Sequence, residues 1–256
     1  MIDVRHVDDS TQAYVRVMPP ALDPPRSGRT PGIDPPALTD AATGNTVRRV
    51  ATTSTAAHPG GGFNPPAPTT RGGPDYGRFV AAVRTLQDHV RAADAPDGVI
   101  TRAAGLIEEV STLLAPYDAD EWSSPSGRRF DLPNRGNILQ VPMRLHRTDG
   151  GVTGQTRFRR YHLGRNGAAH GGAVALLFDS VLGYTAFTST GSRSQRTAYL
   201  HVNYRNVVPI DKKLQVESGF ERIEGRKIFV AGRLLDGETV LAEAEALFVT
   251  LRQGQP

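Results

Sequence analysis

The 256-residue sequence contains no cysteine and no continuous run of about 18 apolar residues. Without cysteine, the chain has no disulfide framework, no thiolate metal site and no cysteine nucleophile. The lack of a long apolar run argues against a membrane span, and the charged residues among positions 1–10 are unlike a signal peptide. We therefore expect a cytoplasmic protein with no membrane span.

Strong charge of one sign is also lacking, because the formal net charge is only +4 and the basic residues are scattered. A nucleic-acid-binding surface needs clustered positive charge, so we expect no nucleic acid partner. His162 and His201 do not have the spacing of metal ligands with a third, acidic residue, so no metal site is expected. The mild basic excess favours anionic small molecules as ligands, and no cofactor is predicted.

Residues 1–74 have few large apolar side chains but many prolines, with Gly60 to Gly62 among them. Such a segment buries too little surface to offset the entropy lost on ordering. The composition predicts a disordered N-terminal tail. A docking arm for a proline-binding partner and a start codon further downstream are the alternatives.

Residues 75–137 are expected to form a helical extension followed by a loop. Phe79, Val83, Leu86 and Val90 recur at spacings of three and four, which predicts an amphipathic helix from Pro74 to Ala93. A second helix follows and is predicted to end at Pro116. It carries Glu108 and Glu109 but only one arginine. We therefore interpret the pair as a cap on the core domain and not as a DNA-reading helix-turn-helix.

Residues 138–256 read as one domain of strands around a single helix. Alternating apolar residues predict a strand at 138–146 and an extended segment at 152–163. After the helix, four further strands are predicted at 197–208, 213–223, 226–235 and 239–251, with Gly219 a possible bulge. Turns at Glu224-Gly225 and Asp236-Gly237 make the last three strands antiparallel neighbours.

The helix between these strands, from His170 to Phe187, is apolar nearly all round and must be wrapped by other elements. One carboxylate, Asp179, lies in its middle, where a charged group needs a partner, a raised pKa or a function. The helix opens with Gly171 and Gly172, and the first N–H groups of a helix have no partner within it. They are suited to an anion or a developing oxyanion. This one element therefore offers both halves of a hydrolytic site, a base and an oxyanion donor.

Three segments together resemble the hotdog-fold acyl-CoA thioesterases of the PaaI type, within the 4-hydroxybenzoyl-CoA thioesterase superfamily. They are His170-Gly171-Gly172 with Asp179 nine residues after the histidine, the strand Thr197 to Tyr204, and the turn Glu224 to Lys227. The likeness covers about residues 138–252. It implies an α+β hotdog fold in which a long central helix is wrapped by an antiparallel sheet.

The resemblance also implies roles for individual residues. Asp179 would be the general base or nucleophile at the thioester carbonyl, and the Gly171 N–H would stabilise the oxyanion. His170 would shape that oxyanion hole or contact the thioester, and Thr197 would hold the water or Asp179. Members of the family often have an asparagine six residues before the histidine. Gly164 stands there in this sequence, and Asn166 is the nearest asparagine.

Coenzyme A carries phosphates, so a basic rim is expected around the site. The basic residues after the helix form the candidate set: Arg193, Arg196, Arg205, Lys212, Lys213, Arg226 and Lys227. We predict that Arg196, Arg205, Arg226 and Lys227 bind substrate, together with Asn166 and Gly172.

The sequence as a whole predicts a hotdog hydrolase that cleaves acyl-CoA thioesters as a homodimer or a dimer of dimers. A hotdog hydratase or dehydratase and a non-enzymatic acyl-CoA-binding protein are the alternatives. The first would carry a histidine shortly after Asp179, and the second would have no need of Asp179. Gly171 and Asp179 lie about 12 Å apart along a helix. We therefore expect each site to combine Gly171 of one subunit with Asp179 of the other.

Overall fold

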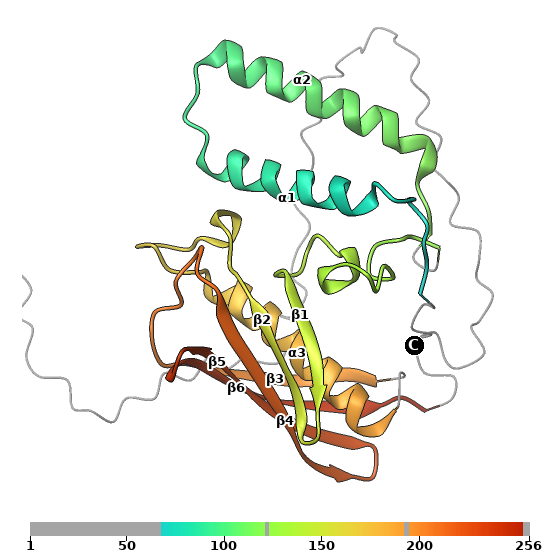
Figure 1. The fold of residues 1–256 in the computed structure, drawn as a ribbon, viewed down its shortest axis with the longest axis vertical. Helices are drawn as coiled ribbons and strands as arrows, with labels where there is room; N and C mark the ends of the chain where they lie inside the picture. Colours follow the sequence, from blue (N-terminus) through green and yellow to red (C-terminus); the bar gives the residue numbers. More distant parts are fainter. Residues whose placement is uncertain (1–67, 121–122, 192–194, 253–256) are drawn as a thin grey trace, which may run out of the picture. The chain divides into compact units, whose positions relative to one another are not determined.

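The long apolar helix of the sequence is α3, Gly171–Thr190, and it packs along one face of a six-stranded antiparallel sheet (Figure 1). This computed structural model describes residues 68–120, 123–191 and 195–252. Two helices, α1 (Tyr76–Ala92) and α2 (Asp97–Leu114), precede the sheet. Short helical turns follow at η1 (Ala115–Tyr117) and η2 (Pro133–Gly136). The predicted helix wrapped by an antiparallel sheet, with two helices before it, is confirmed.

The strands lie in the order β1-β2-β4-β5-β6-β3. Their bounds are β1 Met143–Thr148, β2 Gly151–Thr156, β3 Gln195–Tyr204, β4 Leu214–Glu224, β5 Lys227–Asp236 and β6 Thr239–Thr250. The two predicted hairpin turns are confirmed, and Gly225 and Gly237 adopt positive φ angles of 59° there. The bulge expected at Gly219 instead shifts the register between Phe220 and Arg222. The strand that follows α3 in the chain, β3, neighbours only β6 in this order, so it forms one edge of the sheet.

One side of α3 supplies the centre of the hydrophobic core. Its buried residues are Val174, Leu177, Phe178, Val181, Leu182, Thr185 and Ala186. Opposite them, Ala242, Ala244 and Ala246 of β6 are buried, and these small side chains let the helix lie close to the sheet. By length and mean hydropathy alone α3 reaches the range of a membrane span, which the sequence was not expected to contain. In this fold, however, the sheet covers one side of the helix.

The segments on either side of the β1-β2 hairpin differ from the prediction, because their polar groups bond to α1. The strand predicted at 138–146 begins only at Met143. Before it, the carbonyls of Asn137 and Gln140 accept hydrogen bonds from the buried Arg84 guanidinium at 2.6 and 3.0 Å. Pro142 also lacks the N–H that a strand ladder would use. After β2, the predicted extension to residue 163 turns instead into η3, Arg160–His162.

The contact between α1 and η3 is polar. The Asp88 carboxylate accepts from Arg159 Nε at 2.6 Å and from the Tyr161 N–H at 2.9 Å. Burial alone would raise the pKa of Asp88. The hydrogen bonds from Arg159 and the Tyr161 N–H, together with the positive charge of Arg159, outweigh this effect, so the pKa of Asp88 lies below its usual range. Burial lowers the pKa of His162, whose Nδ1 accepts from the Arg159 N–H. Since Val80 and Arg84 are the buried residues of α1, the helix docks through this side.

The apolar stripe predicted on α1 is turned away from the sheet. Phe79, Leu86 and Val90 are 40%, 41% and 64% exposed. The spacing of three and four therefore predicts the amphipathic helix correctly, but the side of α1 that binds the sheet domain is the polar one. The sequence of α1 does not reveal this polar docking side. The side depends on the Asn137 and Gln140 carbonyls, which accept from Arg84 and lie more than fifty residues away in the chain.

Residues just before α1 make defined contacts with the loop before η2. The side chain of Arg129 is buried and donates to the carbonyls of Arg71 and Gly73 at 3.2 and 3.0 Å. The Thr69 N–H donates to the Arg128 carbonyl at 3.1 Å. The boundary predicted at residue 74 falls inside this contact, whereas residues 1–67 of the predicted tail lie outside the described residues.

Two truncations should therefore differ. A chain that begins at Pro68 keeps the acceptors of Arg129, and we expect its melting temperature to match the full-length protein. A chain that begins at Asp75 leaves a buried guanidinium without two of its acceptors, which should lower the melting temperature by on the order of 5 °C. Calorimetry of both variants makes the comparison, and equal melting temperatures would show that these contacts do not stabilise the fold.

Candidate active site

Asp179 and Thr197 lie together, as the sequence predicted. The Thr197 hydroxyl donates a 2.9 Å hydrogen bond to Asp179 Oδ1. Asp179 comes from the middle of α3 and Thr197 from the first half of β3. Because one carboxylate oxygen is engaged by the hydroxyl, the orientation of the carboxylate is fixed while its other oxygen can accept a proton from water.

A bulge in β3 brings Thr197 to this position. Alternating residues along 197–208 predict that Leu200 and Tyr204 share one face of the sheet and that Thr197 lies on the other. For Thr197 this prediction is wrong. The register with β6 shifts between Thr197 and Tyr199, so Thr197 pairs with Phe248 of the core. The extra residue re-aims the side chain, which is a common use of bulges beside active sites. Such a bulge could not be found from the alternation alone.

At the start of α3, the N–H groups are used unequally. His170 is the N-cap, and its Nδ1 accepts from the Gly172 N–H at 2.9 Å. The Ala173 N–H donates to the His170 carbonyl. Within the described ranges, no acceptor is found for the Gly171 N–H. Gly171 therefore remains as the donor that this helix end offers to a ligand.

Tyr204 supports the same helix end, a role that was not predicted from the sequence. Its hydroxyl donates to the Gly171 carbonyl at 2.8 Å. Burial raises the pKa of the phenol, which keeps it protonated as a donor. The alternation of β3 had placed Tyr204 on the same face as Leu200, and this was the signal that it points toward α3. The contact connects the last residue of β3 to the first residue of α3.

Asn166 lies on an exposed turn before α3, with φ in the left-handed region at 51°. At Gly164, where the family resemblance would place asparagine, an added Cβ would lie 3.0 Å from the His170 Cα. A side chain there would press on the backbone that leads into the helix. The contribution of Asn166 to substrate binding stays a prediction, as does that of Gly172, whose N–H donates to His170.

The proposed basic rim is divided between different contacts. Arg205 is paired with Glu243 at 2.9 Å, and Arg226 donates to the Thr250 carbonyl at 2.9 Å. In the sheet register, Arg196 and Lys227 are both partners of Val249 in β6. Their chain neighbours Thr197 and Ile228 are both partners of Phe248, which lies in the core. Since successive residues of a strand point to opposite faces, Arg196 and Lys227 lie on the face turned away from α3. Phosphate binding by these residues stays a prediction.

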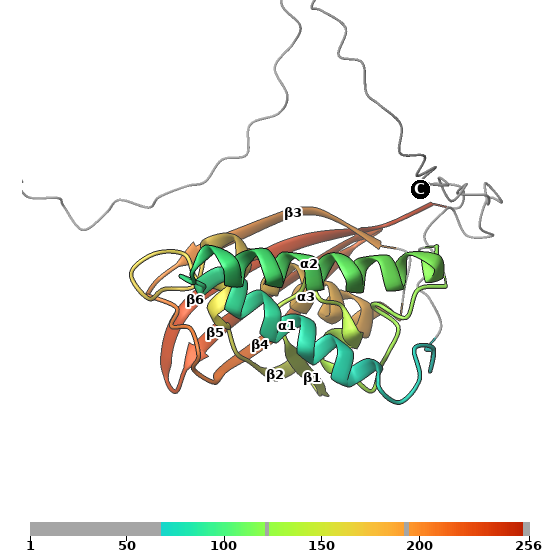
Figure 2. The ribbon, with the colours of Figure 1, turned by 90° about the horizontal axis from the view of Figure 1, so that it is seen from above.

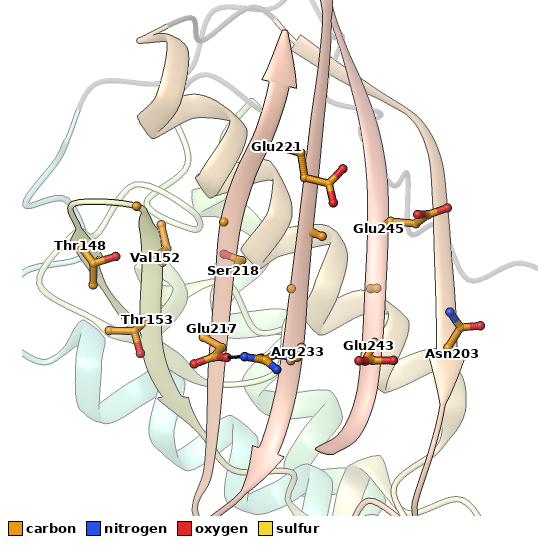
Figure 3. A pocket seen from close by; sticks show the side chains of 15 residues that line it. Thr148, Val152, Thr153, Asn203, Glu217, Ser218, Glu221, Arg233, Glu243 and Glu245 are labelled. Carbon is orange, nitrogen blue, oxygen red and sulfur yellow. Dashed lines mark hydrogen bonds and ion pairs between the residues drawn. The ribbon is translucent and has the colours of Figure 1, made fainter. Parts of the chain in front are cut away.

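A separate pocket of about 640 Å³ lies across the sheet strands, on the side away from α3 (Figure 3). The charged residues in its lining are Glu217, Glu221, Glu243, Glu245 and Arg233. Arg233 is already paired with Glu217 at 2.5 Å. A pocket with this excess of carboxylates repels phosphate groups. It therefore does not suit an anionic ligand, and none of the predicted catalytic residues lines it.

The two halves of the candidate site are separated within one chain. Thr197 marks the Asp179 half and Tyr204 the Gly171 half, so β3 runs along α3 in the opposite direction. Gly171 and Asp179 are eight residues apart, or about 12 Å along the helix axis. A single carbonyl group cannot contact both. The strand that contacts both halves, β3, has no strand neighbour on its outer edge within the described part of the chain.

Comparison with known proteins agrees with this architecture. The sequence profile of the thioesterase superfamily matches residues 166–243, from Asn166 into β6. A crystal structure of a thioesterase superfamily protein aligns with 73% of this chain and 97% of its own chain, with a TM-score of 0.59 and 24% identity. That likeness supports the fold.

Two relatives each match 36% of this chain. Acyl-coenzyme A thioesterase THEM4 of Rattus norvegicus is 35% identical over 95 residues, which are 36% of this chain and 40% of the rat protein. A candidate esterase of Pseudomonas aeruginosa is 30% identical over 93 residues, which are 36% of this chain and 69% of that protein. The chain thus spans well under half the length of the rat protein.

A central helix held in an antiparallel sheet, with a carboxylate at mid-helix and a glycine at the helix start, defines a hotdog-fold protein of the thioesterase type. The profile match and the Pseudomonas relative assign it further: the chain belongs to the thioesterase superfamily.

Proposed function

We propose that this protein hydrolyses acyl-CoA thioesters to free acid and coenzyme A. The observation that carries the proposal is the Asp179 carboxylate, oriented by Thr197 at 2.9 Å and facing the edge of the sheet. Asp179 would take a proton from water, or attack as a nucleophile, and the Gly171 N–H would stabilise the oxyanion. The resemblance to THEM4, an acyl-coenzyme A thioesterase, supports the substrate class.

We further propose that two chains form each site by pairing their β3 edges antiparallel about a two-fold axis. An axis between Leu200 and His201 would set Thr197 of one chain opposite Tyr204 of the other. Thr197 lies three residues before Leu200, and Tyr204 lies three residues after His201. Asp179 of one chain would then approach Gly171 of its mate. Exposed strand edges favour such pairing, and a two-fold axis makes two equal sites.

The two alternatives make different demands on the same residues. A hydratase or dehydratase of this fold would need a histidine shortly after the acidic residue, and none follows Asp179 within α3. A protein that only binds acyl-CoA would not need an oriented carboxylate. The cytoplasmic location stays a prediction, as does a role in lipid metabolism, which acyl-CoA as the substrate class would imply.

Removing the base tests the proposal directly. We expect Asp179→Asn, which keeps the shape but cannot accept the proton, to lower thioesterase turnover by on the order of 10² or more. Thr197→Ala should lower turnover about tenfold by releasing the carboxylate, and Thr197→Ser should restore most of the loss. Release of free thiol from a panel of acyl-CoAs measures all three variants. Turnover within a few-fold of wild type in Asp179→Asn would exclude the aspartate from the mechanism.

Mixed dimers test whether the site is shared. Gly171→Pro removes the N–H at the first helical position, where proline is tolerated, and each single-variant homodimer should be nearly inactive. In an equal, randomly reassembled mixture with Asp179→Asn, half of the dimers are mixed and each has one complete site. About a quarter of wild-type activity should therefore return.

The control for this experiment is Gly171→Ala. Its added Cβ would lie 3.2 Å from the Tyr204 hydroxyl, as would the Cβ of proline, but the N–H is kept. Activity in Gly171→Ala together with loss in Gly171→Pro assigns the effect to the N–H. Verified mixed dimers that recover no activity would show that the catalytic pair lies within one chain.

A further inference from the structure

Helix α2 exposes an unusually wide apolar surface. None of its 18 residues is buried. Seven large apolar side chains are between 41% and 68% exposed: Val99, Ile100, Leu106, Ile107, Val110, Leu113 and Leu114. A helix with such a stripe is stable in water when another element covers it, and a contiguous exposed apolar patch marks an interaction surface.

The rest of the described chain does not cover this surface. In Figures 1 and 2, α2 lies on the outer side of α1, as a layer beyond the helix that docks on the sheet domain. Among the described elements, α2 has substantial backbone contact only with η1, the short turn that follows it. The outward residues of α1, such as Phe79 and Leu86, are themselves about 40% exposed.

The apolar positions of α2 follow the spacing of a coiled-coil seam. Val99, Ala103, Leu106 and Val110 are separated by four, three and four residues, which places them on one line along the helix. Isoleucines at 100 and 107 flank one side of this seam. The other side is flanked by Arg102 and Glu109. These two are one heptad apart, so they occupy equivalent flanking positions with opposite charge.

The flanking charges select the direction of pairing. In an antiparallel helix pair, equivalent flanking positions of the two helices face each other, whereas in a parallel pair each faces the opposite flank. An antiparallel pair therefore sets Arg102 beside Glu109 of the partner subunit, twice, and the isoleucines beside each other. A parallel pair would set Arg102 beside Ile107 of the partner subunit. In the described part of the chain, neither Arg102 nor Glu109 forms an ion pair.

We infer that α2 pairs antiparallel with α2 of a second copy of this chain, about a two-fold axis between Ala103 and Leu106. This register sets Val99 against Val110 of the partner subunit and Ala103 against Leu106 of the partner subunit. Small and large side chains then alternate across the seam, which allows close packing. Shifting the helices by one heptad would instead bring the two Glu109 carboxylates together.

The charge of α2 also argues against a membrane as the occupant. Three carboxylates, Asp97, Glu108 and Glu109, stand against the one guanidinium of Arg102. Amphipathic helices that lie on anionic membranes are rich in lysine and arginine on the polar face. A second α2 offers an apolar stripe to cover the exposed one and charges opposite to Arg102 and Glu109. It therefore fits this helix better than an anionic membrane does.

Cross-linking tests the register, because the chain has no cysteine of its own. Val99→Cys/Val110→Cys places two thiols that are eleven residues apart, too far to join within one helix of about 1.5 Å rise per residue. Oxidation, or a short bis-maleimide, should convert this variant to covalent dimers. Val99→Cys alone should give few dimers, because Val110 stands opposite it.

Charge reversal in the same cysteine background tests the partner. Arg102→Glu should slow cross-linking several-fold, and adding Glu109→Arg should restore it, whereas Thr101→Glu on the outer side of α2 should have no effect. No cross-link in the double-cysteine variant, or equal cross-linking by Val99→Cys alone, would overturn the antiparallel pair. The thiols lie outside the candidate active site, so either result leaves the proposed hydrolysis to be judged by its own assay.

Discussion

The burial of α3 is the constraint on which the rest of this structure depends. The helix is apolar on nearly every side, so it must be surrounded, yet it carries Asp179 at its middle. The sheet covers one side with the small residues of β6 and the buried residues of β4 and β5. The side that bears the carboxylate faces β3, the edge strand. Burial of the helix and access to the carboxylate are therefore achieved on different sides of the same element.

The same constraint explains why the two halves of the candidate site lie apart in one chain. The carboxylate is fixed by Thr197 and the helix start by Tyr204, so the two halves are held about 12 Å apart along a rigid helix. Neither half can move to the other without breaking α3. A second copy at the β3 edge would supply the missing half. Pairing with a second copy would also cover the exposed edge, which would otherwise be open to unspecific pairing.

Much of the fold followed from the sequence because the signals were local. The period of two in β5 and β6, the turns at Gly225 and Gly237, and the apolar α3 each depend on neighbouring residues. The features that could not be predicted depend on residues that are distant in the chain. The bulge that turns Thr197 toward Asp179 is set by register with β6, and the polar docking of α1 is set by carbonyls freed more than fifty residues away. For the site, the pairing of Asp179 with Thr197 was foreseen through family resemblance, whereas the bond from Tyr204 was not.

The most direct measurement is a crystal structure with a hydrolysis-resistant ketone analogue of an acyl-CoA. If the site is shared, the ketone oxygen should lie about 3 Å from the Gly171 N–H of one chain. The carbonyl carbon should lie within about 4 Å of the Asp179 carboxylate of the other chain, or of a water that this carboxylate holds. An analogue whose carbonyl contacts Gly171 and Asp179 of the same chain, or neither residue, would contradict the shared site.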